Sequence, residues 1–203
     1  MQHTHLVGIS GLPRSGKDAL AEEFVRSGYY GVSFGDIVRE FTRGRHHDKP
    51  DPISVANMTE TANWLRETKG ADVVLKEALN RYEAAKQHQQ YKGLVLFSVR
   101  APVEADFILS HGGELIWVEA SDEVRHARNL KHQRSGEAPV DLTEFKRQED
   151  LQWQPQPGVP PEAQMNVSYV RQKATRQLEN NSGDLQTFLA NAQKLIQELQ
   201  AQS

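Results

Sequence analysis

Gly11-Leu12-Pro13-Arg14-Ser15-Gly16-Lys17-Asp18 is the stretch that decides the fold of this chain. Its spacing, G-x-x-x-x-G-K, is that of a phosphate-binding P-loop, with Asp18 where Ser or Thr is usual. Glycines let such a loop turn tightly, so that consecutive N–H groups face an anion. The helix that follows adds its positive end, and Lys17 adds a full charge for the β and γ phosphates. The predicted phosphate-binding set is Gly11, Arg14, Ser15, Gly16, Lys17, Asp18 and Ala19.

The sequence on both sides of this stretch fits a strand–loop–helix unit. Leu6-Val7-Gly8-Ile9-Ser10 is a short apolar run typical of a buried strand. After the loop, Ala19, Leu20, Phe24 and Val25 fall on one helical face. A glycine-rich turn with an incidental lysine would not require a buried strand before it and a helix after it. The context therefore favours the P-loop interpretation.

Composition limits the classes of protein to consider. The 203 residues are enough for one sizeable α/β core, so we expect a single domain spanning 1–203. The absence of cysteine excludes disulfides, cysteine metal sites and thiol catalysis. A formal net charge of −3 gives no global reason to bind DNA, RNA or a membrane. With no apolar run near the roughly 20 residues of a membrane span and no signal-peptide pattern, we expect a soluble, cytoplasmic protein.

Strand and helix patterns alternate along the chain. Leu94-Val95-Leu96-Phe97-Ser98-Val99 is the strongest strand signal and is typical of the centre of a sheet. We expect strands at 6–10, 29–34, 94–99, 114–120 and 175–178. We expect helices at 59–79, 103–110, 123–134, 143–153 and 185–199, with exposed loops at 43–52 and around the prolines at 155–161. This alternation predicts a parallel sheet covered by helices on both faces.

In order along the chain, several segments resemble the nucleoside-monophosphate-kinase branch of P-loop proteins, which includes adenylate kinases, dephospho-coenzyme A kinases and deoxynucleoside monophosphate kinases. The matching segments are 11–18, Ser33-Phe34-Gly35-Asp36 with Arg39, Leu65-Arg66-Glu67, Val99-Arg100-Ala101-Pro102, 125–134 and 180–183. The resemblance implies a three-layer P-loop NTPase fold with sheet order 2-3-1-4-5. It also implies an acceptor-binding region at about 36–92 and a lid-like region at about 122–153.

The resemblance also implies ATP and Mg²⁺ as cofactors and gives the charged side chains roles. Transfer of a phosphoryl group between two anions requires neutralisation and in-line positioning, for which bidentate guanidinium groups are well suited. The expected acceptor-binding residues are Asp36, Arg39, Arg66 and Arg100. The expected lid residues are Arg125, Arg128 and Arg134, and the expected catalytic residues are Lys17, Asp36, Arg100 and Arg128. For each arginine, the alternative is a surface ion pair with a neighbouring glutamate.

Two positions depart from the family pattern. Phe97 stands where the third strand of such kinases usually carries an aspartate that orients magnesium, and Asp18 replaces the P-loop hydroxyl that normally contacts the metal. A carboxylate is itself a ligand that Mg²⁺ accepts, so Asp18 is the predicted metal ligand. Asp36 would be a general base if the acceptor is a hydroxyl, and an orienting group if the acceptor is a phosphate.

Three functions follow from these residues. The first is ATP-dependent phosphoryl transfer to a nucleotide or nucleotide-like acceptor, with dephospho-coenzyme A and other small molecules as alternative acceptors. The second is a GTPase or ATPase switch, although neither a D-x-x-G nor an N-K-x-D segment supports the GTPase form. The third is a nucleotide-binding protein without phosphoryl transfer, which Phe97 keeps open. The choice between ATP and GTP and the oligomeric state stay open at this point.

Overall fold

A parallel sheet forms the centre of the computed structural model, which describes residues 5–131, 140–155 and 164–201. The strands lie in the order β2-β3-β1-β4-β5. They are β1 (His5–Ser10), β2 (Tyr30–Ser33), β3 (Gly93–Phe97), β4 (Glu114–Glu119) and β5 (Arg176–Glu179). All neighbouring strands pair in parallel, and Ser33 and Ile9 both lie opposite Phe97. The predicted fold class and strand order are confirmed.

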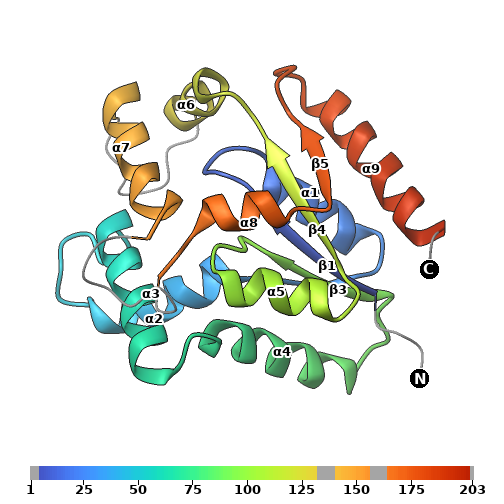
Figure 1. Cartoon of the computed structure of the whole chain (residues 1–203), viewed down its shortest axis with the longest axis horizontal. Coiled ribbons are helices and arrows are strands. Elements are labelled where there is room, and N and C mark those ends of the chain that lie inside the picture. The colour runs from blue at the N-terminus through green and yellow to red at the C-terminus, as the bar shows by residue number, and fades with distance from the viewer. Residues whose placement is uncertain (1–4, 132–139, 156–163, 202–203) are drawn as a thin grey trace.

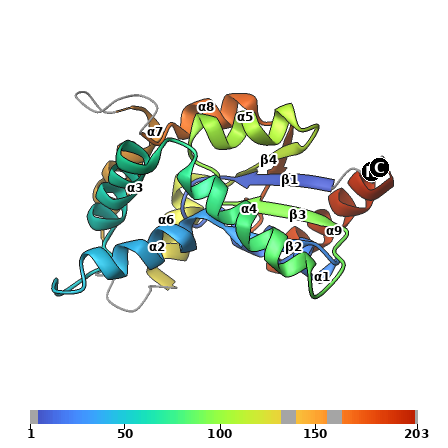
Figure 2. The ribbon, with the colours of Figure 1, turned by 90° about the horizontal axis from the view of Figure 1, so that it is seen from below.

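Helices cover both faces of this sheet. They are α1 (Lys17–Arg26), α2 (Phe34–Arg45), α3 (Val55–Lys69), α4 (Val73–Lys86), α5 (Pro102–Ser110), α6 (Asp122–Lys131), α7 (Leu142–Trp153), α8 (Val167–Lys173) and α9 (Leu185–Ala201). Figure 2 shows α5 and α8 on one side of the strands, with α1 and α9 on the other. The same view places α2, α3, α6 and α7 together beyond the arrowheads of the strands. Figure 1 shows β4 and β5 running side by side toward α6.

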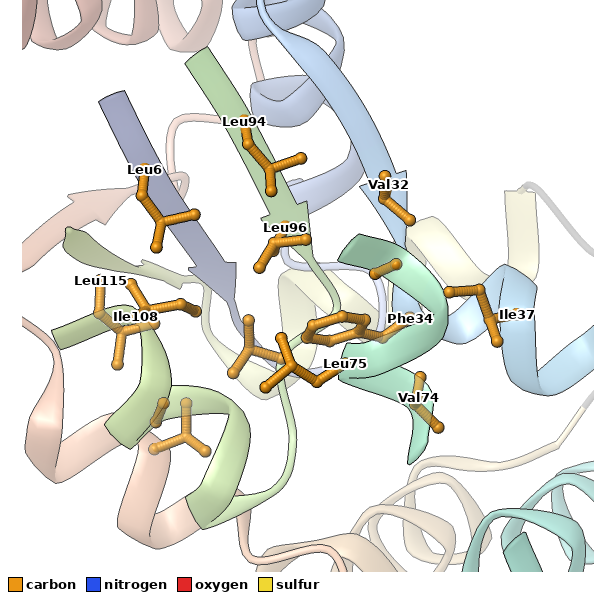
Figure 3. Packing of buried hydrophobic residues seen from close by; sticks show 14 of the residues in the cluster. Leu6, Val32, Phe34, Ile37, Val74, Leu75, Leu94, Leu96, Ile108 and Leu115 are labelled. Atoms are coloured by element: carbon orange, nitrogen blue, oxygen red, sulfur yellow. The ribbon is translucent and has the colours of Figure 1, made fainter. Parts of the chain in front are cut away.

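The core has two halves because the central strands β1, β3 and β4 bury side chains on both of their faces. Leu6, Leu94 and Leu96 point to the face covered by α4 and α5, where Phe34 and Ile108 join them (Figure 3). The alternate strand residues pack on the opposite face against α1 and α9. Those residues are Val7, Ile9, Val95, Ile116 and Val118. Burial on both faces explains why β1 and β3 are continuous apolar runs rather than alternating ones.

The segment 59–79 differs from the expected single helix. The structure divides it into α3 and α4, which are separated at Gly70. Gly70 ends α3 with a φ of 104°, a conformation that side chains other than glycine rarely adopt. The helical pattern continued on both sides of this residue, so periodicity alone did not show the break.

Two other segments differ from the sequence-based expectation. The expected loop at 43–52 starts too early, because α2 continues to Arg45 and the next residue, His46, is buried. Helix α8 was not predicted, although its Val170 lies in the core. The proline-marked loop lies outside the described residues from 156 to 163. No described helix is long and apolar enough to cross a membrane.

Candidate functional site

The P-loop joins the carboxyl end of β1 to the start of α1 and has the predicted backbone geometry. Gly11 and Gly16 have φ angles of 153° and 107°, and Arg14 also has a positive φ of 64°. A Cβ atom on Gly11 would lie 2.6 Å from Oγ of Ser15 and 2.7 Å from the carbonyl oxygen of Val118. Glycine is therefore required at Gly11 both for its backbone conformation and for space.

Two side chains of this loop are buried in a way that suits a bound phosphate. The Lys17 side chain is 6% exposed, and its Nζ lies 3.8 Å from Oδ2 of the exposed Asp18. The hydroxyl of Ser15 is buried, and it has no hydrogen-bond partner among the described residues. An unsatisfied buried hydroxyl costs free energy, and a phosphate oxygen in the loop would accept its hydrogen bond. The residues present therefore fit a nucleotide phosphate.

The expected lid residue Arg128 contacts the P-loop directly. Its Nη1 donates to the carbonyl oxygens of Arg14 and Ser15, at 3.2 and 3.4 Å. Arg14 in turn donates from Nε to Oδ1 of Asn129, 3.0 Å away on the same helix, α6. Burial lowers the pKa of the Arg128 guanidinium. The expected lid residue Arg134 lies outside the described residues.

Arg125 was also expected to act in the lid, but the structure places it in a buried network. Its side chain is 1% exposed and forms ion pairs with Glu149 of α7 and, at 2.6 Å, with Asp122. It also donates to the carbonyl oxygens of Ala120 and Pro13. Burial raises the pKa of Glu149, and Arg125 opposes that rise. Arg125 thus joins α6, α7 and the P-loop within a buried network.

The predicted acceptor residues Asp36 and Arg39 lie on α2, which begins where β2 ends. Oγ of Ser33 caps this helix by accepting from the backbone N–H of Asp36 at 3.1 Å. The side chain of Asp36 is exposed and forms an ion pair with Arg39 one turn later. Ser98 follows the carboxyl end of the neighbouring strand β3, and its φ of 62° is uncommon for a residue other than glycine. Two predicted acceptor residues therefore lie at the carboxyl end of the sheet and contact each other.

The other two predicted acceptor residues, Arg66 and Arg100, both contact a glutamate that the sequence reasoning missed. Nη2 of Arg66 donates to Oε1 of Glu104 at 3.0 Å, and the two side chains are 3% and 1% exposed. The second carboxylate oxygen accepts from the backbone N–H groups of Arg100 and Ala101, at 2.8 and 3.0 Å. The sequence signal was a glutamate in the first turn of a helix that starts at Pro102, where a carboxylate caps free N–H groups.

The structure supplies few protein ligands for a metal. Among the described residues there is no cluster of three or more histidine or acidic side chains that could hold a metal ion. Phe97 stands at the carboxyl end of β3, opposite Ile9 and Ser33. Asp18 is the acidic residue within the P-loop stretch, and one carboxylate is compatible with Mg²⁺ held mainly by phosphates and water.

The sequence profile of the AAA_18 family, described as an AAA domain, matches residues 7–152. This chain belongs to that family. A UPF0200 protein of Thermococcus kodakarensis is 27% identical over 96% of this chain and 97% of its own length. A UPF0200 protein of Pyrobaculum aerophilum is 30% identical over 70% of this chain and 73% of its own length. A match to a UPF0200 protein of Methanococcus maripaludis, 27% identical, covers 61% of this chain and 64% of that relative. The chain thus belongs with the UPF0200 proteins as well.

Solved structures share the fold. A shikimate kinase from Bacteroides thetaiotaomicron superposes with a TM-score of 0.54, covering 97% of this chain and 98% of the kinase, at 13% sequence identity. At that identity the likeness concerns the fold alone. The predicted three-layer P-loop fold is therefore confirmed.

Proposed function

We propose that this protein transfers a phosphoryl group from ATP to a nucleotide or nucleotide-like small molecule. The observation that carries the proposal is the pair of buried groups in the P-loop, the Lys17 side chain and the orphaned Ser15 hydroxyl. Both lie at the carboxyl end of the sheet, where α2 begins with the predicted acceptor residues Asp36 and Arg39 and where Arg100 precedes α5. An in-line transfer requires donor and acceptor sites that lie close together, as they do at the carboxyl end of one parallel sheet.

The donor side follows from the chemistry of the loop. When bound, Mg²⁺-ATP supplies the phosphoryl group and neutralises part of its charge. Gly11 and Gly16 let the loop backbone approach the phosphates, and Lys17 holds a positive charge beside them. Asp18 is the proposed protein contact for the metal or for its water shell. Phe97 leaves this role to Asp18, because its ring has no metal-binding atom.

The acceptor side explains why an anionic acceptor is preferred. Glu104 fixes one edge of the Arg66 guanidinium, while Nε of Arg66 stays buried without a partner among the described residues. An acceptor oxygen would satisfy that donor. With Arg39 and Arg100, the region holds three guanidinium groups against the two carboxylates of Asp36 and Glu104. Guanidinium groups bind phosphate oxygens through charged hydrogen bonds, so these residues suit an acceptor that carries a phosphate.

A second candidate function is nucleotide binding without phosphoryl transfer. Phe97 favours it, because a P-loop protein that lacks the strand-three aspartate keeps its phosphate cradle and loses one means of orienting the metal. The two functions share the donor site and differ in whether an acceptor is turned over.

The test is a screen for acceptor-dependent ADP formation from ATP. The panel contains nucleoside monophosphates, their deoxy forms and dephospho-coenzyme A, and each acceptor is run with the unchanged protein and with Lys17→Ala. We expect one acceptor class to raise ADP formation in the unchanged protein and not in the variant. Tight ATP binding without turnover of any acceptor would instead support the nucleotide-binding function.

A further inference from the structure

Two side chains contact the P-loop through its carbonyl oxygens. Asn180, the residue that follows β5, donates from Nδ2 to the carbonyl oxygen of Ser15 at 2.7 Å. Arg128 donates from Nη1 to that same oxygen and from Nη2 to the carbonyl and Oδ1 oxygens of Asn180, at 2.9 and 3.0 Å. The two side chains therefore bind each other and converge on one peptide group of the loop.

The contact between Asn180 and the loop leaves no room for a side chain at Gly16. A Cβ atom on Gly16 would lie 2.2 Å from Nδ2 of Asn180, which is closer than such atoms approach. Gly16 is thus required for its φ of 107° and also because the Asn180 amide fills the space beside it. A residue 164 positions further along the chain helps to explain the second glycine of the motif.

The orientation of a peptide group links this contact to phosphate binding. In a trans peptide the carbonyl of one residue and the N–H of the next point in opposite directions. Holding the Ser15 carbonyl therefore fixes the direction of the Gly16 N–H, which is one of the donors that a P-loop offers to an anion. The acceptors found for Arg128 among the described residues are all backbone or amide oxygens. Its positive charge is thus not cancelled by a carboxylate there and adds to the potential at the loop.

We propose that Asn180 and Arg128 are positioning residues that hold the P-loop in its phosphate-binding conformation from the carbonyl side. The inference rests on the proposed function, because it assumes that the loop binds the phosphates of a nucleotide. It differs from a contact with the nucleotide base, since Asn180 acts through the backbone of Ser15 and Gly16. It also gives Arg128 a role beneath the loop, in addition to the expected role in the lid.

The test uses two ligands that share phosphates and differ in the base. ATP affinity is measured by calorimetry, and inorganic tripolyphosphate is measured as a competitor of ATP, so both report on one site. Asn180→Ala removes the hydrogen bond to the Ser15 carbonyl and the one that Oδ1 accepts from Arg128. Loss of the bond to the loop should weaken both ligands by a similar factor, about 2- to 10-fold. A base contact would weaken ATP and leave tripolyphosphate unchanged, and that result would overturn the inference.

Matched variants separate positioning from folding. Asn181→Ala removes the neighbouring amide, whose Oδ1 accepts from the Ser121 N–H at 2.8 Å, and should leave both affinities unchanged. Asn180→Asp keeps the side-chain size but places an oxygen where Nδ2 donates, so it should weaken both ligands at least as much as alanine does. If thermal unfolding shows that Asn180→Ala does not fold, Asn180→Asp takes its place as the test variant.

A coupled pair provides a second readout. Arg128→Ala and Asn180→Ala remove donors from the same Ser15 carbonyl, so their effects on tripolyphosphate binding should not add in the double variant. The inference would be contradicted if the effects of Arg128→Ala and Asn180→Ala on tripolyphosphate binding added fully in the double variant. It would also be contradicted if tripolyphosphate binding were unchanged in both Asn180 variants. Neither result would contradict the proposed nucleotide site. Failure of tripolyphosphate to compete with ATP in the unchanged protein would overturn the proposed nucleotide site itself.

Discussion

Arg66 and Glu104 form a buried ion pair that joins α3 to the first turn of α5, with 3.0 Å between Nη2 and Oε1. The same carboxylate accepts from the backbone N–H groups of Arg100 and Ala101. One glutamate therefore orients Arg66, an arginine of the proposed acceptor site, and caps the helix that follows the central strand β3. Its removal would affect both the stability of the fold and the shape of the proposed acceptor site.

Glu104→Ala should lower the free energy of unfolding by about 3–5 kcal/mol, because it leaves the buried Arg66 charge without its partner. Urea denaturation measures this change. The control is Glu60→Ala, which breaks an exposed pair with Arg45 at 3.4 Å and should cost about 1 kcal/mol or less. Equal losses in the two variants would contradict the structural role assigned to Glu104.

Arg100→Ala should weaken binding of the acceptor found in the screen by about 10- to 100-fold, the usual effect of losing one charged hydrogen bond. ATP affinity should be spared, because the donor phosphates bind at the P-loop. Calorimetric titration of each ligand gives the comparison, and Arg45→Ala, on the outer part of α2, is the matched arginine control. A similar loss of ATP and acceptor binding would indicate a folding or donor-site defect instead.

Asp18→Asn should raise the Mg²⁺ concentration needed for half-maximal activity, because it removes the one carboxylate of the P-loop stretch. Initial rates at fixed ATP over a magnesium titration show the shift. If the dependence does not move, Asp18 acts only as a negative charge at the start of α1, where it complements the helix dipole.

Asp122 should make stability depend on acid pH. Its hydrogen bond from Lys146, at 2.5 Å, and that from Arg125 hold its pKa below the ordinary value of 3.8. Because the folded pKa is the lower one, this contribution is present above pH 3.8 and is lost as the pH falls through the folded value. Asp122→Asn should flatten the acid limb of stability against pH. Asp48→Asn, on an exposed turn, is the control, and equal acid limbs in the Asp122 variant and the unchanged protein would refute the prediction.

The sheet and the P-loop could be predicted because their signals are local. Continuous apolar runs mark β1 and β3, and the glycines of the loop stand at positions where the backbone has a positive φ. The resemblance to P-loop kinases supplied the strand order, which the strand patterns alone did not give.

The partners of the arginines could not be predicted, because they depend on contacts between distant segments. Arg66 meets Glu104 from 38 positions away, and Arg128 meets Asn180 from 52. Arg125 is buried through its contact with Glu149 of α7. The periodicity of a helix shows which of its faces is apolar and does not show which other helix it packs against. Sequence patterns therefore selected candidate arginines and missed the carboxylates and amides that contact them.

ATP titration into Lys17→Ala, compared with the unchanged protein, tests the central claim most directly. Lys194→Ala, on an exposed part of α9, is the matched lysine control. We predict that Lys17→Ala folds normally and loses at least about 10-fold in ATP affinity, as expected for one charged contact to the phosphates. The control should bind ATP like the unchanged protein. Unchanged ATP affinity in Lys17→Ala would contradict the assignment of the loop as a nucleotide-phosphate site.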